Sequence, residues 1–85
     1  MTWQVILTQR ACRDLRNLDR PVTIRIIRAI NQYAQTRYGD VIPLRGREQE
    51  WRLRVGQWRV LFTFDEANES IVILRVLPRG RAYRN

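Results

Sequence analysis

Arginine is the residue of this sequence best placed to do chemistry. The sequence contains neither lysine nor histidine, so all 16 basic residues are arginines, and with 8 acids the net charge is +8. The guanidinium group is a planar fork of donors that suits phosphate, but it stays protonated and accepts protons poorly. We therefore expect a polyanion or an acidic protein as partner. A genome rich in G and C is the alternative explanation for the missing lysines.

Three of these arginines are predicted to share one surface of a β-hairpin. Residues 51–64 alternate as two strands around Gly56-Gln57, the Gly-X pair of a two-residue type II′ turn. This turn fixes the register, so that Arg54 faces Arg59 and Arg52 lies on the same surface. Like charges placed opposite one another cost up to about 1 kcal/mol, which a bound phosphate would offset. The alternative is a solvated sheet face whose arginine stems cover apolar surface.

A basic tail adds to the candidate site. Arg79, Arg81 and Arg84 follow the last expected strand with Tyr83 between them and no acid. A ring for stacking and cations for phosphate are what a splayed nucleotide needs. The alternative for Tyr83 is a ring that packs the tail onto the domain.

The remaining reactive side chains give weaker signals. Glu48 and Glu50 precede the arginine strand and are expected mainly to balance neighbouring arginines. Cys12 is expected to be a small buried side chain, since no histidine exists to activate it, and a single cysteine forms no internal disulfide. The eight acids are scattered, so the sequence predicts neither a metal site nor a cofactor.

The apolar pattern predicts the elements that carry these residues. Thr8 is the expected N-cap of a first amphipathic helix, a break at Asp19-Arg20-Pro21 begins a second, and Gly39 is the expected stop. Residues 40–49, with Pro43 and Gly46, are expected to form a connecting loop. The expected strands are residues 3–7, 51–55, 58–64 and 71–77, the first at or near an edge and the last central.

Together these elements predict an α+β fold with a single domain over residues 1–85. It would consist of an N-terminal strand, an antiparallel helical hairpin and a three-stranded antiparallel sheet, with the helices packed on one face. No apolar run approaches the roughly 20 residues of a membrane span and no signal segment is evident, so a cytoplasmic location is expected. The side chains expected to face the helices are Trp51, Leu53, Val55, Trp58, Val60, Phe62 and Phe64.

The order of elements and three sequence blocks resemble the RelE/ParE toxin superfamily. The blocks are PLRG at 43–46, WRLRVGQWRVLF at 51–62 and VLPRGRAYR at 76–84, and the resemblance covers nearly the whole chain. It implies a toxin of a type II toxin–antitoxin module that an acidic antitoxin neutralises by wrapping the domain. RelE-like members cleave messenger RNA in the ribosome without a metal, using the ribose 2′-hydroxyl as nucleophile, and this is the activity we expect.

The resemblance also implies roles for individual residues. Arginines of the hairpin would clamp the scissile phosphate, those of the tail would stabilise the transition state, and the tyrosine would stack on a base or transfer a proton. Glu48 and Glu50 are alternative proton acceptors. The catalytic positions are Arg52, Arg54, Arg59, Arg79, Arg81 and Tyr83, and the further RNA contacts are Arg45, Arg47, Arg75 and Arg84.

Two departures from the family pattern leave the activity open. The family often has lysine at the positions of Arg52 and Arg54 and histidine at the position of Pro78. Lysine or histidine could shuttle a proton, whereas arginine only stabilises charge. The alternatives are therefore a ParE-like inhibitor of DNA gyrase and a non-catalytic protein that binds an antitoxin or regulates transcription.

Overall fold

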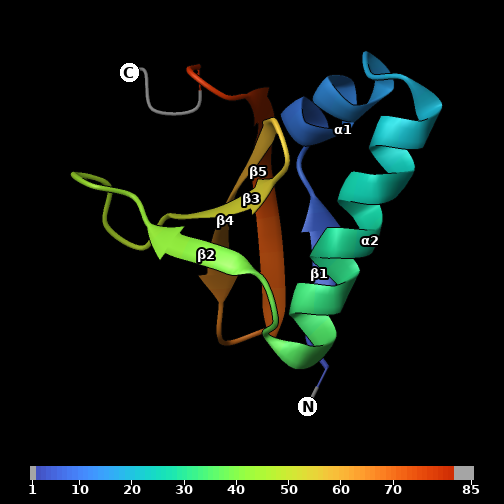
Figure 1. Cartoon of the computed structure of the whole chain (residues 1–85). Helices are drawn as coiled ribbons and strands as arrows, with labels where there is room; N and C mark the ends of the chain where they lie inside the picture. Colours follow the sequence, from blue (N-terminus) through green and yellow to red (C-terminus); the bar gives the residue numbers. More distant parts are fainter. Residues whose placement is uncertain (1, 82–85) are drawn as a thin grey trace.

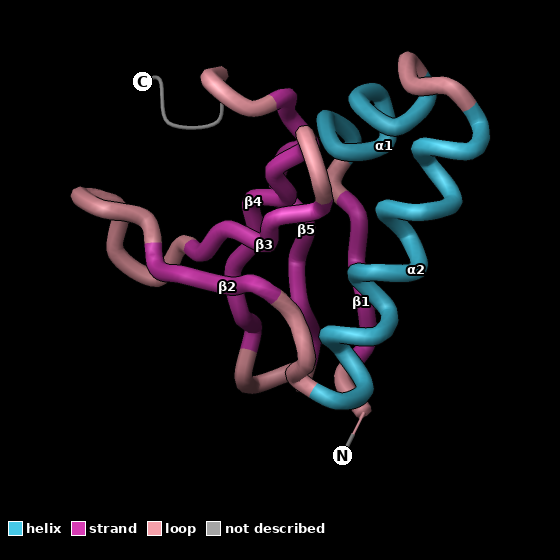
Figure 2. The backbone as a smooth tube through the Cα atoms, viewed as in Figure 1, coloured by secondary structure: helices cyan, strands magenta, loops and turns pink. Residues whose placement is uncertain are grey.

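Two helices cover one face of a five-stranded sheet in the computed structural model of the chain, which describes residues 2–81 (Figure 1). The strand order is β1-β5-β4-β3-β2, with β1 parallel to β5 and the other neighbours antiparallel. Figure 2 shows the helices on one side of the sheet, which confirms the predicted α+β class. The elements are β1 (Gln4–Leu7), α1 (Gln9–Arg16), α2 (Arg20–Thr36), β2 (Asp40–Pro43), β3 (Trp51–Val55), β4 (Trp58–Asp65) and β5 (Ser70–Pro78).

The start of the helical pair follows its sequence signals. The Thr8 hydroxyl accepts a hydrogen bond from the Ala11 N–H at 3.1 Å and so caps α1 as predicted. Proline lies in the first turn of α2, where its missing N–H costs nothing. The Thr23 hydroxyl then donates to the Leu15 carbonyl oxygen at 3.0 Å, which ties the two helices together.

The end of α2 differs from the prediction. The helix stops at Thr36 rather than at Gly39, because Arg37 adopts the left-handed conformation with a φ of 64°. Its guanidinium donates to the carbonyl oxygens of Tyr33 and Ala34 and lies 4.7 Å from the centre of the Trp3 ring. These contacts offset the cost of left-handed backbone for a residue with a side chain.

Four residues of the expected loop at 40–49 form a strand, which corrects that prediction. Strand β2 pairs with β3 and forms one edge of the sheet, and Pro43 closes it at a position where a missing N–H is tolerated. Strand β1 forms the other edge beside a central β5, as predicted. Within residues 2–81, no helix is long and apolar enough to cross a membrane.

The main core lies between the helices and the sheet. All seven hairpin side chains that were expected to face the helices belong to it. Four of them are buried, and the three others, Trp51, Trp58 and Phe64, pack at its margin. The helices contribute Ala11, Leu15, Ile26, Ile30, Tyr33 and Ala34, and β5 contributes Ile71, Ile73 and Val76.

A bulge in β5 redirects the chain before it reaches the basic tail. Phe62 pairs with Ile73 but Leu61 pairs with Arg75, so Leu74 is an extra residue. The Asp14 carboxylate of α1 accepts hydrogen bonds from the Arg75 side chain at 2.8 and 3.1 Å and from the Val76 N–H at 2.9 Å. Burial acts to raise the pKa of Asp14, but these hydrogen bonds and the nearby arginine charges outweigh burial and lower it below 3.8.

Candidate phosphate-binding face

The sheet face turned away from the helices, called the outer face below, carries a row of charged side chains. Asp40 on β2 pairs with Arg54 on β3, which pairs in turn with Arg59 on β4. Arg52 lies in the next row, opposite Leu61. This is the register predicted from the turn, and Gly56 has the positive φ, 58°, that a type II′ turn requires at its first position. We call Arg52, Arg54 and Arg59 the arginine group.

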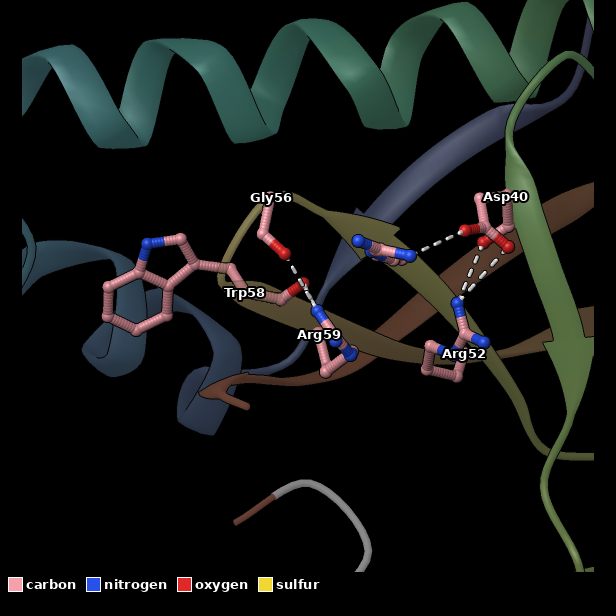
Figure 3. Close-up of polar contacts among 6 residues, drawn as sticks. Asp40, Arg52, Gly56, Trp58 and Arg59 are labelled. Carbon is pink, nitrogen blue, oxygen red and sulfur yellow. Dashed lines mark hydrogen bonds and ion pairs between the residues drawn. The ribbon is translucent and has the colours of Figure 1, made fainter. Parts of the chain in front are cut away.

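Arg52 is buried against the sheet, with 8% of its surface exposed. Its Nη1 donates to the backbone oxygen of Asp40 at 3.2 Å and to Oδ1 of the same residue at 3.3 Å (Figure 3). Its Nε is buried and has no hydrogen-bond partner within the described part of the chain. A buried donor without a partner costs about 1–3 kcal/mol of stability.

Arg54 is the exposed member of the arginine group. Its side chain retains 56% of its accessible surface, and its nearest acid is again Asp40, with 3.8 Å between Arg54 Nη1 and Asp40 Oδ2. One carboxylate therefore lies between two arginines, with a different oxygen toward each. Arg54 is the member that a ligand can reach without rearranging the sheet.

Arg59 is held by the hairpin that carries it. It is 7% exposed, and its Nη1 donates to the carbonyl oxygens of Gly56 at 2.9 Å and Trp58 at 3.0 Å (Figure 3). No carboxylate within residues 2–81 lies within ion-pair distance of it. Its positive charge is thus held in a fixed position beside Arg54, where two carbonyl oxygens accept its hydrogen bonds.

A small apolar cluster supports the arginine group from the side of β5. Leu44 and Leu61 are buried against each other, with Leu74 and Leu77 packed on them, so this second core lies on the outer face. Leu77 pairs across the sheet with Arg59, and Leu61 pairs with Arg52. The cluster explains why both arginines are buried, and the sequence analysis missed it, because Leu44 belongs to the segment treated as a loop.

The C-terminal segment begins beside the arginine group but then diverges from it. The Arg79 N–H donates to the Gln57 carbonyl oxygen at 2.7 Å, so Arg79 lies next to the hairpin turn. Arg81 lines a hollow between α1 and the end of β5, together with Asp14, Trp58 and Arg75. Tyr83 and Arg84 lie outside the described residues.

The other predicted site residues lie apart from the arginine group. Arg45 is exposed in the loop between β2 and β3, and Arg47 in the same loop pairs with Glu50 at 3.5 Å. Arg75 is bound to Asp14 on the helix side. Glu48 is exposed and Cys12 is half-buried. Within residues 2–81, no three potential metal ligands gather at one place.

Asp40 is the residue of this site that the sequence analysis missed. The pairing of β2 with β3 places it opposite Arg54, and that signal was hidden because its segment was expected to be a loop. With Asp40 included, the described part of the outer face can bind and stabilise negative charge. Arginine cannot accept a proton, so proton transfer would require a group from elsewhere.

Comparisons with known proteins agree with this geometry. The family model described as "ParE toxin of type II toxin-antitoxin system, parDE" matches residues 5–83. The chain is similar to a chain of the archaeal RelE–RelB complex from Pyrococcus horikoshii OT3, with 27% identity and a TM-score of 0.77 over 96% of this chain and 100% of that one. It is also similar to a chain of the toxin–antitoxin complex RelBE2 from Mycobacterium tuberculosis, with 31% identity and a TM-score of 0.77 over 93% and 100%.

More distant structures show the fold alone. A doubly substituted mutant of the E. coli toxin RelE in the free state shares 16% identity and a TM-score of 0.77, over 96% of this chain and 88% of that one. A search of curated protein sequences finds no match.

Proposed function

Since the chain belongs to the family of ParE toxins of type II toxin–antitoxin systems, we propose that this toxin acts by cutting messenger RNA on the ribosome, with the outer face as its RNA-binding surface. The similar structures from Pyrococcus horikoshii and Mycobacterium tuberculosis are complexes of a toxin with its antitoxin, and the partner of this chain is likewise a cognate antitoxin. Its net charge of +8 suits an acidic protein and a nucleic acid equally well.

The arginine group is the observation that carries the proposal. Arg54 is exposed and pairs directly with Arg59, an arrangement of like charges that folding alone disfavours. A phosphate diester of RNA carries one negative charge on two free oxygens, which suits a guanidinium fork. Binding of a phosphate would relieve the repulsion, and the apolar cluster of the outer face holds the arginines in place meanwhile.

The chemistry that such a face supports is attack by the ribose 2′-hydroxyl. The 2′-oxygen forms a bond to the adjacent phosphorus, the bond to the 5′-oxygen breaks, and the products are a 2′,3′-cyclic phosphate and a 5′-hydroxyl. Arg54 and Arg59 stabilise the extra negative charge at phosphorus in the transition state. Tyr83 takes the 2′-hydroxyl proton or delivers one to the leaving oxygen, and Arg79 and Arg81 add positive charge for the transition state. Glu48 and Glu50 are the alternative acceptors.

A translating extract tests this proposal. Messenger RNA incubated with the full-length chain should be cut within codons, and Arg54→Ala should lower the rate at least about tenfold, since removal of one transition-state donor typically costs a hundredfold or more. Tyr83→Phe separates proton transfer from stacking, because phenylalanine keeps the ring but lacks the hydroxyl. A loss of cutting in this variant indicates proton transfer, and retained cutting indicates stacking. Arg28→Ala removes an exposed arginine from α2 and should leave cutting unchanged. Intact messenger at toxin concentrations that stop translation would refute the nuclease.

Inhibition of DNA gyrase is the second candidate, and two observations favour it. The matching family model is that of ParE toxins, and the sequence has no lysine or histidine to transfer a proton. A gyrase inhibitor needs only a binding surface. Purified gyrase with the full-length chain should then lose supercoiling activity or accumulate cleaved DNA, while the extract assay shows intact messenger.

A further inference from the structure

Asp40 occupies the place where the proposed function puts a phosphate. Its Oδ1 lies 3.3 Å from the Nη1 of Arg52 (Figure 3), and its Oδ2 lies 3.8 Å from the Nη1 of Arg54. A phosphate has the same charge and presents its oxygens in a similar way. We propose that Asp40 is an internal anion that occupies the arginine group in the free protein and is displaced when a phosphate of the RNA backbone binds.

The contacts of Asp40 are those of a displaceable ligand. Charge-assisted hydrogen bonds of this kind are usually 2.7–2.9 Å long. The Asp14–Arg75 pair is an example of a tight ion pair in this chain, because both carboxylate oxygens accept from one guanidinium, at 2.8 and 3.1 Å. Asp40 makes longer contacts through single oxygens, and its side chain is half exposed. Such pairs are weak, so a phosphate can compete for these arginines.

Release of the carboxylate would leave Arg52 in position. The Arg52 Nη1 also donates to the backbone oxygen of Asp40 at 3.2 Å, and the pairing of β2 with β3 fixes that oxygen. Arg54 lies on the same strand and needs no carboxylate to remain on the outer face. The role of Asp40 is therefore to occupy the site rather than to build it.

The structure also offers room for the displaced side chain. Asp40 and Arg54 border a hollow of about 560 Å³, whose other walls include Gln32, Tyr38 and Gly39. The carboxylate can turn into this hollow while a phosphate takes its place between the arginines. A ligand must therefore bind these arginines more strongly than the Asp40 carboxylate does. This requirement favours a polyanion with several phosphates over a single small anion.

The test is the affinity of Asp40→Asn for two anionic probes, inorganic triphosphate and a single-stranded RNA of about 12 nucleotides, at one fixed salt concentration. Asparagine keeps the shape and the backbone oxygen but removes the charge. We expect both probes to bind about three- to tenfold more tightly, the range that loss of one or two partly exposed ion pairs gives. Thermal unfolding of the variant checks that it is folded.

Two controls separate local exchange from overall charge. Glu66→Gln removes the same charge from the exposed turn between β4 and β5, and should change affinity less than about twofold. In an Arg54→Ala background, the gain in binding free energy from Asp40→Asn should fall by at least half, because only the contact of Asp40 with Arg52 is left to remove. Unchanged or weaker binding by Asp40→Asn, or a gain no larger than that of Glu66→Gln, would overturn the inference.

The inference rests on the proposed function for its ligand, but the two can fail separately. A gain with triphosphate alongside intact messenger in the extract would refute the nuclease and retain the internal anion. Cutting of messenger without any gain in affinity from Asp40→Asn would retain the nuclease and refute the internal anion.

Discussion

Replacement of Asp14 by alanine should destabilise the fold more than any other loss of a single carboxylate in residues 2–81. Its carboxylate holds the bulge of β5 by three hydrogen bonds, two from Arg75 and one from the Val76 N–H. Hydrogen bonds to a charged group contribute about 1.5–3 kcal/mol each, but Arg75 keeps part of its surface in water and regains solvation when released. We therefore expect a loss of about 2–3 kcal/mol in the free energy of unfolding, or roughly 10–20 °C in Tm for a domain of this size.

Equilibrium urea unfolding measures this loss, and Asp19→Ala is its control. Asp19 precedes α2 and is exposed, but its side chain makes no capping hydrogen bond. Its removal should change the free energy of unfolding by less than about 0.5 kcal/mol. Equal losses for the two variants would refute the idea that Asp14 pins the bulge.

The pH dependence of Asp14→Asn provides an independent check. The folded protein lowers the pKa of Asp14 below 3.8, because hydrogen bonds from Arg75 and Val76 outweigh the effect of burial. As pH falls, the unfolded chain takes up the proton first, so the stabilisation is complete above about pH 5 and declines progressively as pH falls through 3.8 toward the lower pKa of the folded state. The stability gap between the natural sequence and Asp14→Asn should therefore narrow between pH 7 and pH 3.5, and a constant gap would refute the assigned cause.

Three further substitutions test local features, with urea unfolding as the measurement and Arg28→Ala as a neutral control. Gly56→Ala should cost about 1–2 kcal/mol, because φ is 58° and the added Cβ would collide with the guanidinium of Arg25; Arg25→Ala in the same chain should restore part of the loss. Thr8→Ala should cost about 1 kcal/mol through loss of the α1 cap. Arg37→Ala should cost about 1–2 kcal/mol, since its guanidinium binds two carbonyl oxygens and lies over three aromatic rings.

The β3–β4 hairpin could be predicted in detail because the residues that determine its pairing are close together in the sequence. A two-residue turn fixes which residues pair, and the alternation of side chains fixes which face each residue occupies. Both predictions are confirmed, from Val55 opposite Trp58 at the turn to Trp51 opposite Phe62 at the far end. The α+β class followed from the same alternation, together with the 3.6-residue period of the two helices.

Strand β2 could not be predicted because its structure depends on a partner. It has four residues, includes a proline and pairs on one side only, so its own sequence carries little strand signal. The error had a consequence for the site, since the residue opposite Arg54 was unknown until the sheet was complete. The end of α2 was missed for a related reason: contacts of Arg37 with distant aromatic rings outweigh the local preference for glycine.

The alternation of side chains predicted which sheet face each arginine occupies but not how far each one is buried. Arg52, Arg54 and Arg59 share the outer face as expected, yet two of them are buried and one is exposed. The difference arises from Leu44 and from the bulge at Leu74, neither of which has a short-range signature in the sequence. A sheet face that looks uniformly solvated in sequence can thus contain its own small core.

The difference between the two buried arginines and the exposed one determines how the arginine group can bind a ligand. Arg52 and Arg59 are held by backbone oxygens and cannot move far toward a ligand, so they supply a fixed positive field. Arg54 is free of backbone contacts among the described hydrogen bonds and can close on a phosphate that enters this field. The two fixed arginines can therefore stabilise a bound phosphate without reorganising, while Arg54 adapts to its position. The same arrangement moves no proton, which is why the choice between RNA cleavage and inhibition of gyrase depends on residues beyond the arginine group.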